Sequence, residues 1–119
     1  MAWVRIYSTM IDDGNHEADE KEVIVLQVRL NENHTIDTEM QAFGYIEEYS
    51  EDTNTYLKYP FILQFESKKE NMAKLDYGGW DTETTAKINI LTKHIKNNET
   101  FTLFADSEYI YRIEQVTQI

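Results

Sequence analysis

Few residues in this 119-residue chain have the types and spacing that chemistry requires. The stretch Asp12-Asp13-Gly14-Asn15-His16-Glu17 is rich in oxygen atoms and resembles a loop that could hold a hard cation. Calcium, however, needs several oxygen ligands at set positions, and the spacing does not match the Asp-x-Asp-x-Asp-Gly…Glu loop. We therefore expect a solvated acidic loop here and no metal site.

The sequence does not predict a zinc site either. The chain has no cysteine, and its histidines, His16, His34 and His94, are far apart and form no His-x-x-x-His pattern. A zinc ion usually takes three or four protein ligands, so all three histidines or added carboxylates would have to meet. Isolated surface histidines are the simpler interpretation, and we expect no metal or other cofactor.

Catalytic patterns are also missing. No serine lies in a Gly-x-Ser-x-Gly elbow, which is the strand-to-helix turn of many hydrolases. The adjacent acids Glu47 and Glu48 could do acid/base work only together, but neighbouring residues on a strand point to opposite faces. We expect no catalytic residue and no enzyme activity.

The one glycine pair lies between two large aromatic residues, in Asp76-Tyr77-Gly78-Gly79-Trp80-Asp81. A Gly-Gly step is typical of a turn, and tyrosine and tryptophan are enriched in interface hot spots. We expect Tyr77 and Trp80 to contact a partner. The alternative is that the two rings clamp the turn against the core.

Charge is the strongest signal. The chain has 22 acidic residues against 11 lysines and arginines, a formal charge of −11. Nucleic acid and anionic membranes repel such a protein, so neither is expected as a direct partner. Much of the charge lies in residues 12–22 and 47–52. The predicted partner-binding residues are Asp12, Asp13, Glu17, Asp19, Glu20, Glu47, Glu48, Glu51, Asp52, Tyr77 and Trp80.

The elements that must position these residues are strands. The length suits one domain over residues 1–119, and β-branched and aromatic residues dominate the apolar set. We predict a mainly β fold: an antiparallel β-sandwich or small barrel of about six or seven strands, with at most one or two short helices. The clearest part is a three-stranded meander after Thr85, which includes a strand over 100–104. Val116 falls out of phase with Tyr109, Tyr111 and Ile113, which indicates a bulge or a strand end.

Other segments leave more room for alternatives. Strands are expected over 3–9 and 23–30. A hairpin over about 39–66 is preferred, although residues 36–50 also fit helical spacing. Pro60 places its strand at an edge or a bulge, because proline cannot donate to a ladder. Residues 67–76 are the best candidate for a short helix.

These features favour a binding protein. In composition, the chain is similar to inhibitor and immunity proteins, such as phage proteins that block host defence enzymes and antitoxins that cap a nuclease. That similarity implies docking to a basic, nucleic-acid-handling protein through carboxylates, with aromatic anchors. The alternatives are a virion-type assembly protein that self-associates, for example as a homodimer, and a small-ligand binder. Because no apolar run is long enough to span a membrane and the N-terminus lacks signal-peptide features, we expect a cytoplasmic protein.

Overall fold

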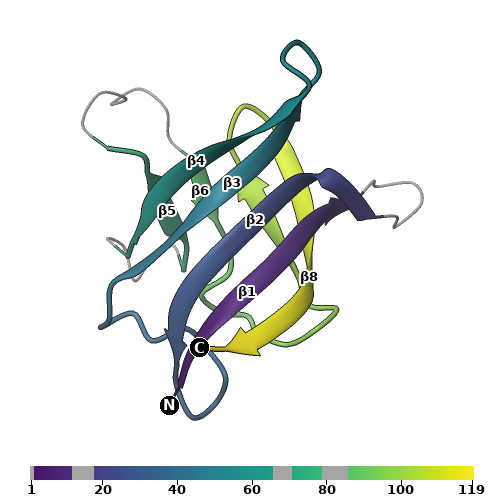
Figure 1. Ribbon diagram of the computed structural model, residues 1–119. Coiled ribbons are helices and arrows are strands. Elements are labelled where there is room, and N and C mark those ends of the chain that lie inside the picture. Colours follow the sequence, from purple (N-terminus) through teal and green to yellow (C-terminus); the bar gives the residue numbers. More distant parts are fainter. Residues whose placement is uncertain (1, 12–17, 66–70, 79–85) are drawn as a thin grey trace.

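Eight antiparallel strands run through the described part of the chain and close into a barrel in chain order (Figure 1). The computed structural model describes residues 2–11, 18–65, 71–78 and 86–119, and for residues 18–21 it describes the backbone alone. Each strand pairs with the next, and β1 pairs with β8 to close the barrel. The strands are β1 (Ala2–Ile11), β2 (Ala18–Leu30), β3 (Ala42–Ser50), β4 (Thr55–Gln64), β5 (Ala73–Asp76), β6 (Ala86–Ile88), β7 (Thr100–Phe104) and β8 (Glu108–Gln118).

The predicted antiparallel β class is confirmed, but the predicted number of strands was too small. The strand that was not predicted is β5, which has only four residues and too little alternation to stand out in the sequence. The predicted meander after Thr85 is present as β6, β7 and β8, although β6 has only three residues. The helix predicted over 67–76 is wrong in its described part, because Ala73 and Leu75 are buried on one face of β5 while Lys74 is not. The described residues contain no helix, and therefore none that could cross a bilayer.

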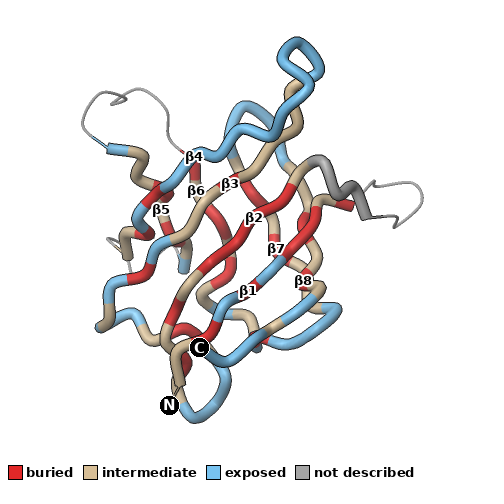
Figure 2. Tube along the Cα trace, viewed as in Figure 1, coloured by how far each residue is buried: buried red, intermediate tan, exposed pale blue. Residues whose placement is uncertain are grey.

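Apolar residues at alternate positions of the strands form one buried core. Figure 2 marks the buried positions in red along the trace. On β2, Ile24, Leu26 and Val28 are fully buried, as the period-two pattern predicted. Phe101 on β7 and Ile113 on β8 pack in the same core. Each such side chain contributes about 1.5–3 kcal/mol on burial.

The ambiguous stretch 36–50 becomes strand β3 from Ala42 onward. Gly44 permits this pairing, because a Cβ at this position would collide with the backbone carbonyl oxygen of Val25 on β2. The following turn, residues 51–54, ends at Asn54 with a φ of 54°, a left-handed conformation that asparagine tolerates well. The predicted hairpin of β3 and β4 is therefore confirmed.

Two further predictions concern ladder irregularities. Pro60 pairs with Tyr45 of β3, whereas the described ladder from β4 to β5 covers only Ile62 to Gln64. Proline thus lies beyond that ladder, where its missing N–H costs no bond to β5. The register between β1 and β8 shifts where Ser8 pairs with Ile113 but Tyr7 pairs with Gln115, which accounts for the changed phase of Val116.

The up-and-down order gives the two ends of the barrel different sets of connections. We call the end at which β1, β3, β5 and β7 finish the mouth, and the opposite end the base. The chain ends meet near the base (Figure 1), where the Ile119 N–H donates to the Trp3 carbonyl oxygen at 3.0 Å. Strands that alternate in direction bring every odd-to-even connection to the mouth. Both predicted acidic segments, 12–22 and 47–52, flank strand ends there.

Candidate functional site

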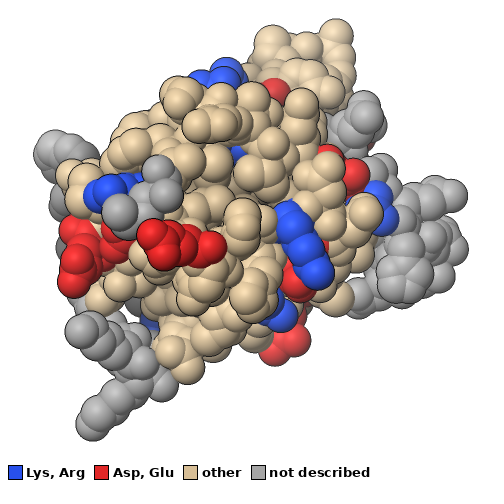
Figure 3. All heavy atoms as spheres, turned by 90° about the horizontal axis from the view of Figure 1, so that it is seen from below, with Lys and Arg blue, Asp and Glu red and all other residues tan. Residues whose placement is uncertain are grey.

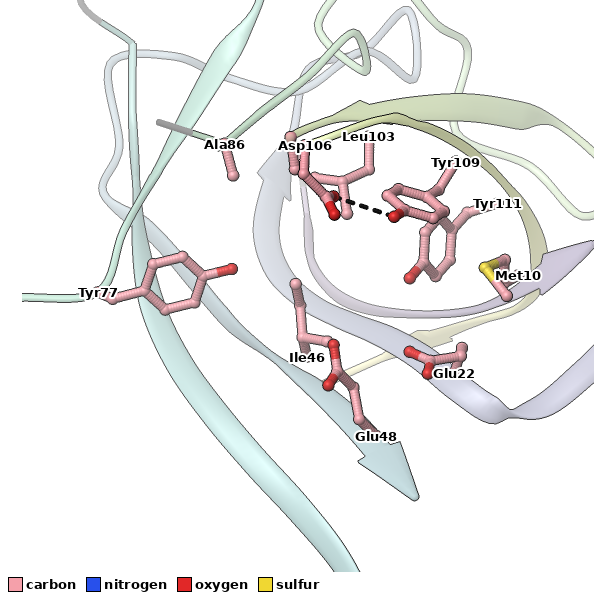
Figure 4. Close-up of a pocket in the computed structure, with 11 residues that line it drawn as sticks. Met10, Glu22, Ile46, Glu48, Tyr77, Ala86, Leu103, Asp106, Tyr109 and Tyr111 are labelled. Carbon is pink, nitrogen blue, oxygen red and sulfur yellow. Dashed lines mark hydrogen bonds between the residues drawn. The ribbon is translucent and has the colours of Figure 1, made fainter. Parts of the chain in front are cut away.

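A cavity of about 300 Å³ opens at the mouth of the barrel (Figure 4). Its apolar wall includes Ile46 and Leu103. The polar side chains that line it are Glu22, Glu48, Tyr77, Asp106, Tyr109 and Tyr111. Among the described residues, this lining contains three carboxylates and no lysine or arginine, so a cation entering it meets a negative potential.

Strand alternation explains why two of the carboxylates face inward. Glu22 lies two residues before the fully buried Ile24 on β2, and Glu48 lies two residues after the buried Ile46 on β3. Residues two apart on a strand share a face. The face that carries apolar side chains in the core therefore carries carboxylates at the rim.

Glu22 and Glu48 are also direct cross-strand partners in the β2–β3 ladder. Side chains at directly opposite positions have Cβ atoms about 5 Å apart, and like charges there are destabilising. Both side chains are half-buried and line the same cavity. The pair therefore concentrates negative charge on one wall.

Asp106 and Tyr109 form the wall across the cavity from this pair (Figure 4). Asp106 lies in the turn between β7 and β8, and its Oδ1 accepts a hydrogen bond from the Tyr109 hydroxyl at 3.0 Å. That bond, together with burial and the negative charge of Asp106, raises the pKa of Tyr109. Tyr109 thus stays a neutral donor that holds the Asp106 carboxylate in place.

Tyr111 is the most buried of the polar lining residues, with 2% of its surface exposed. Its ring stacks on Phe101 at a centroid distance of 5.8 Å and an interplanar angle of 15°. Its hydroxyl points into the cavity (Figure 4) and makes no hydrogen bond with any described residue. Burial raises the pKa of this hydroxyl, and the charges of Glu22 and Glu48 raise it further, so Tyr111 remains protonated.

Tyr77, a predicted partner-contact residue, follows β5 and lines the cavity with its hydroxyl directed inward (Figure 4). Its ring packs edge-to-face on Phe61 at 5.8 Å. The turn that carries it is fixed because Asp76 Oδ1 accepts the Gly78 N–H at 2.9 Å, and Gly78 has a φ of 107°. Trp80, the other predicted anchor, lies outside the described residues.

The predicted acidic segment 47–52 divides between different surfaces. Glu48 faces the cavity, whereas Glu47 faces outward and lies 3.8 Å from the Lys58 Nζ of β4. Glu51 and Asp52 are exposed in the turn between β3 and β4. The two adjacent glutamates therefore do not converge, in keeping with strand geometry.

The predicted segment 12–22 is only partly described. Asp12, Asp13 and Glu17 lie outside the described residues, and Asp19 and Glu20 lie on β2 where the backbone alone is described. The strand ends beside them, Ile11 and Ala18, pair with each other at the mouth. The segment is thus anchored to the same end of the barrel as Glu48.

Four polar lining residues were missing from the predicted site, namely Glu22, Asp106, Tyr109 and Tyr111. Alternation had placed Tyr109 and Tyr111 on one face with Ile113, but it could not show that this face turns toward a cavity. Asp106 stood only in an expected turn. No local sequence pattern gives that information for Tyr109 and Tyr111, because their position depends on the pairing of β8 with β1, which is distant in sequence.

The base carries a different charge pattern. Figure 3, which views the barrel from that end, shows lysines and arginines interspersed with acids. One example is Arg29 Nη1, which lies 3.9 Å from Asp37 Oδ2. A second cavity of about 310 Å³ opens near the base and includes Glu32 and His34 in its lining. Among the described lining residues, the mouth cavity has three carboxylates, whereas this one has only Glu32.

The mouth carboxylates are spread around a rim and not gathered about a point. Within the described ranges, no three His, Asp or Glu side chains lie close enough to hold a metal ion. Oxygen atoms on separate walls instead suit a larger cationic group that carries several donors. The chain matches no protein-family model, no curated protein and no solved structure.

Proposed function

We propose that this protein is an acidic binding module of the inhibitor or immunity type, which docks a basic, nucleic-acid-handling protein at the mouth of the barrel. The observation that carries the proposal is the mouth cavity, which Glu22, Glu48 and Asp106 line without a basic lining residue among those described. We assign the module no catalytic step and place it in the cytoplasm.

The topology supports a directional field at this end. The turn between β3 and β4 presents the exposed Glu51 and Asp52, and the turn between β7 and β8 presents Asp106 beside Glu108 at the start of β8. Charge of one sign at one end steers an oppositely charged partner and increases its association rate. A partner that binds nucleic acid has a basic groove, in which these carboxylates would take the place of phosphates.

The lining also supplies aromatic anchors. Tyr77 and Tyr109 combine a flat apolar ring with a hydroxyl, and side chains of this kind carry much of the binding energy in interfaces. They line the same cavity as the carboxylates, so a partner docked over the cavity would exclude water from the charged contacts. Exclusion of water strengthens those contacts, because the effective dielectric constant falls.

A second candidate function is self-association through the outer face of β3 and β4. Phe43 and Ile62 are direct cross-strand partners and are 46% and 42% exposed. Tyr56, further along β4, is 51% exposed. Exposed apolar clusters of this kind favour protein contacts, and light scattering over a concentration series would detect a homodimer.

The proposed docking is tested by affinity capture from host lysate at low and at high salt. The wild-type protein is compared with the double variant Glu48→Gln/Asp106→Asn and with a matched double variant at the base, Glu32→Gln/Glu39→Gln. Both variants remove two negative charges, so they differ only in which end they alter. A competing arm adds duplex DNA, which should displace the module from a basic groove.

We expect a basic protein that the wild type and the base variant capture at low salt, and that the mouth variant loses. Its capture should weaken as salt rises and as DNA is added. Equal capture by both variants would contradict docking at the mouth. Capture only of acidic or neutral proteins would contradict the proposed class of partner.

A further inference from the structure

Resting on the proposed function, we propose that the mouth cavity is a pocket for one guanidinium group, which in the docked complex is an arginine side chain of the basic partner. The group would lie between the Glu22–Glu48 wall and the Asp106–Tyr109 wall, with the Tyr111 hydroxyl at its inner end. The proposal thus assigns a ligand to a specific cavity, whereas the proposed function concerns the whole end of the barrel.

The size of the cavity suits a single side chain. Its volume of about 300 Å³ is at the lower limit of small-molecule pockets, which hold roughly 300–1,000 Å³. The wall includes Ile46 and Leu103 as well as tyrosine rings, so the methylene groups of a long side chain would meet apolar surface. A charged head and an apolar stem are the two parts of an arginine side chain.

Tyr111 adds an available hydroxyl at the inner end of the cavity. The residue is 2% exposed, yet its hydroxyl points into the cavity and has no hydrogen-bond partner among the described residues. Among the described residues, no side-chain N or O atom is both buried and unpartnered, so this hydroxyl is open to the cavity and accessible to a ligand. A ligand N–H that donates to this oxygen would satisfy it, whereas an apolar ligand would leave it unpaired.

The opposed Glu22 and Glu48 specify the sign of that ligand. Their direct pairing across the β2–β3 ladder brings like charges together on the cavity wall. A cation between this wall and Asp106 would offset that repulsion. An anionic ligand would add to it, so phosphates and carboxylates are poor candidates for the occupant.

The placement of the acceptors favours guanidinium over ammonium. Oxygen atoms of Glu48, Asp106 and Tyr111 approach the cavity from different walls (Figure 4). A guanidinium has five N–H donors in one plane and can also stack on aromatic rings, whereas an ammonium is a compact and strongly hydrated charge. The planar group can therefore reach several walls at once and loses less hydration on entry.

The same chemistry could come from a free small molecule, so the test uses a defined probe before any partner is known. Butylguanidinium is titrated into isotopically labelled full-length protein at low salt, and the chemical shifts of the tyrosine rings are followed by NMR. Butylammonium and the neutral isostere butylurea are titrated in parallel. The variants are Glu48→Gln and Tyr111→Phe, with Glu39→Gln at the base as the control, and thermal unfolding verifies that each variant is folded.

We expect saturable binding of butylguanidinium with shifts centred on Tyr77, Tyr109 and Tyr111. Butylurea should bind at least tenfold more weakly, and butylammonium should be intermediate. Glu48→Gln should weaken butylguanidinium about tenfold, since it removes a charged hydrogen-bond acceptor. Tyr111→Phe should weaken it severalfold, and Glu39→Gln should leave it unchanged.

The proposed guanidinium pocket would be overturned if butylguanidinium binding does not saturate, or if butylurea binds with equal affinity. Docking of a basic protein could still be lost on Glu48→Gln/Asp106→Asn in the capture experiment, so the two proposals fail separately. Once a partner is known, its arginines are replaced by lysine one at a time. A single position with a large effect identifies a partner side chain as the source, whereas retained partner affinity with tight butylguanidinium binding identifies a free small ligand.

Discussion

Glu22 and Glu48 lie directly opposite one another on β2 and β3, and both carboxylates line the mouth cavity. Two like charges at directly opposite positions destabilise a sheet. Favourable cross-strand pairs contribute roughly 0.2–1 kcal/mol to stability, and the penalty for a like-charged pair is of similar size. The alternation that buries Ile24 and Ile46 would equally accommodate apolar side chains at these two positions. Glutamate at both positions lowers stability, as expected where the two carboxylates serve a binding surface.

The first prediction follows from that pair. Glu48→Gln should raise the free energy of unfolding by about 0.5 kcal/mol at low salt, because it removes the repulsion with Glu22. The measurement is urea denaturation at low and high ionic strength, and the gain should shrink as salt screens the wild-type repulsion.

Its control is the neighbouring residue on the same strand. Glu47 faces outward and pairs with Lys58 at 3.8 Å, so Glu47→Gln should leave stability unchanged or lower it by up to about 1 kcal/mol. A loss of stability in Glu48→Gln as large as that in Glu47→Gln would show that Glu22 and Glu48 do not repel each other in the folded barrel.

The second prediction concerns alkaline pH. Burial raises the pKa of Tyr111 above its ordinary value of 10.0, so the folded state keeps a proton that the unfolded chain releases near that pH. The unfolded state then binds fewer protons, and stability falls as pH rises beyond about 10. For this one group, the slope reaches at most about 1.4 kcal/mol per pH unit.

Tyr111→Phe should flatten that fall when unfolding free energies are measured from pH 8 to 11. The matched control is Tyr56→Phe, whose side chain is 51% exposed on the outer face. At neutral pH, Tyr111→Phe should keep or slightly raise stability, because the hydroxyl that it removes has no partner among the described residues. An alkaline slope that is the same in Tyr111→Phe and wild type would rule out Tyr111 as its source.

Periodicity predicted much of the fold. The faces of β2 and β8, the hairpin of β3 and β4 and the edge character of Pro60 all depend on neighbours within a few residues. Closure does not, because the pairing of β1 with β8 joins residues such as Ser8 and Ile113 that are distant in sequence. β5 was predicted as helix because Met72 and Leu75, three residues apart, share a face only in a helix, whereas the alternation of Ala73 and Leu75 is too short to stand out.

The candidate site followed the same division. The acidic segments were visible as composition, and the strand ends that flank them share the mouth as a consequence of alternating strand direction. The cavity could not be predicted, because it depends on the facing of Glu48, Asp106 and Tyr111 across a closed barrel. The sequence gives the number of carboxylates in each segment, whereas only the structure distinguishes those that face the cavity from those exposed to solvent.

The third prediction tests the fit of β3 against β2. Gly44→Ala should lower the free energy of unfolding by about 1–3 kcal/mol, because the added Cβ would collide with the Val25 carbonyl oxygen and force the strands apart. Urea denaturation measures the loss. Since Glu22 pairs with Glu48 in the same ladder, the variant should also shift the tyrosine resonances of the mouth. An unchanged stability would mean that the β2–β3 ladder can yield at Gly44.

The last prediction separates steering from contact once a basic partner is in hand. Glu51 and Asp52 are exposed in a turn, whereas Glu48 is half-buried in the cavity wall. Rim charges act mainly on the association rate, and buried charges act mainly on the dissociation rate. Glu51→Gln/Asp52→Asn should therefore slow association severalfold at low salt and leave dissociation unchanged.

Glu48→Gln should do the reverse and speed dissociation about tenfold, at little cost to association. Surface plasmon resonance at two salt concentrations measures both rates, with Glu32→Gln/Glu39→Gln at the base as the charge-matched control. If Glu51→Gln/Asp52→Asn associates as fast as that control, the turn between β3 and β4 does not steer the partner. If Glu48 is desolvated in the complex, neutralising it must shorten the lifetime of the complex. A dissociation rate that is unchanged in Glu48→Gln would therefore place the docked surface outside the cavity.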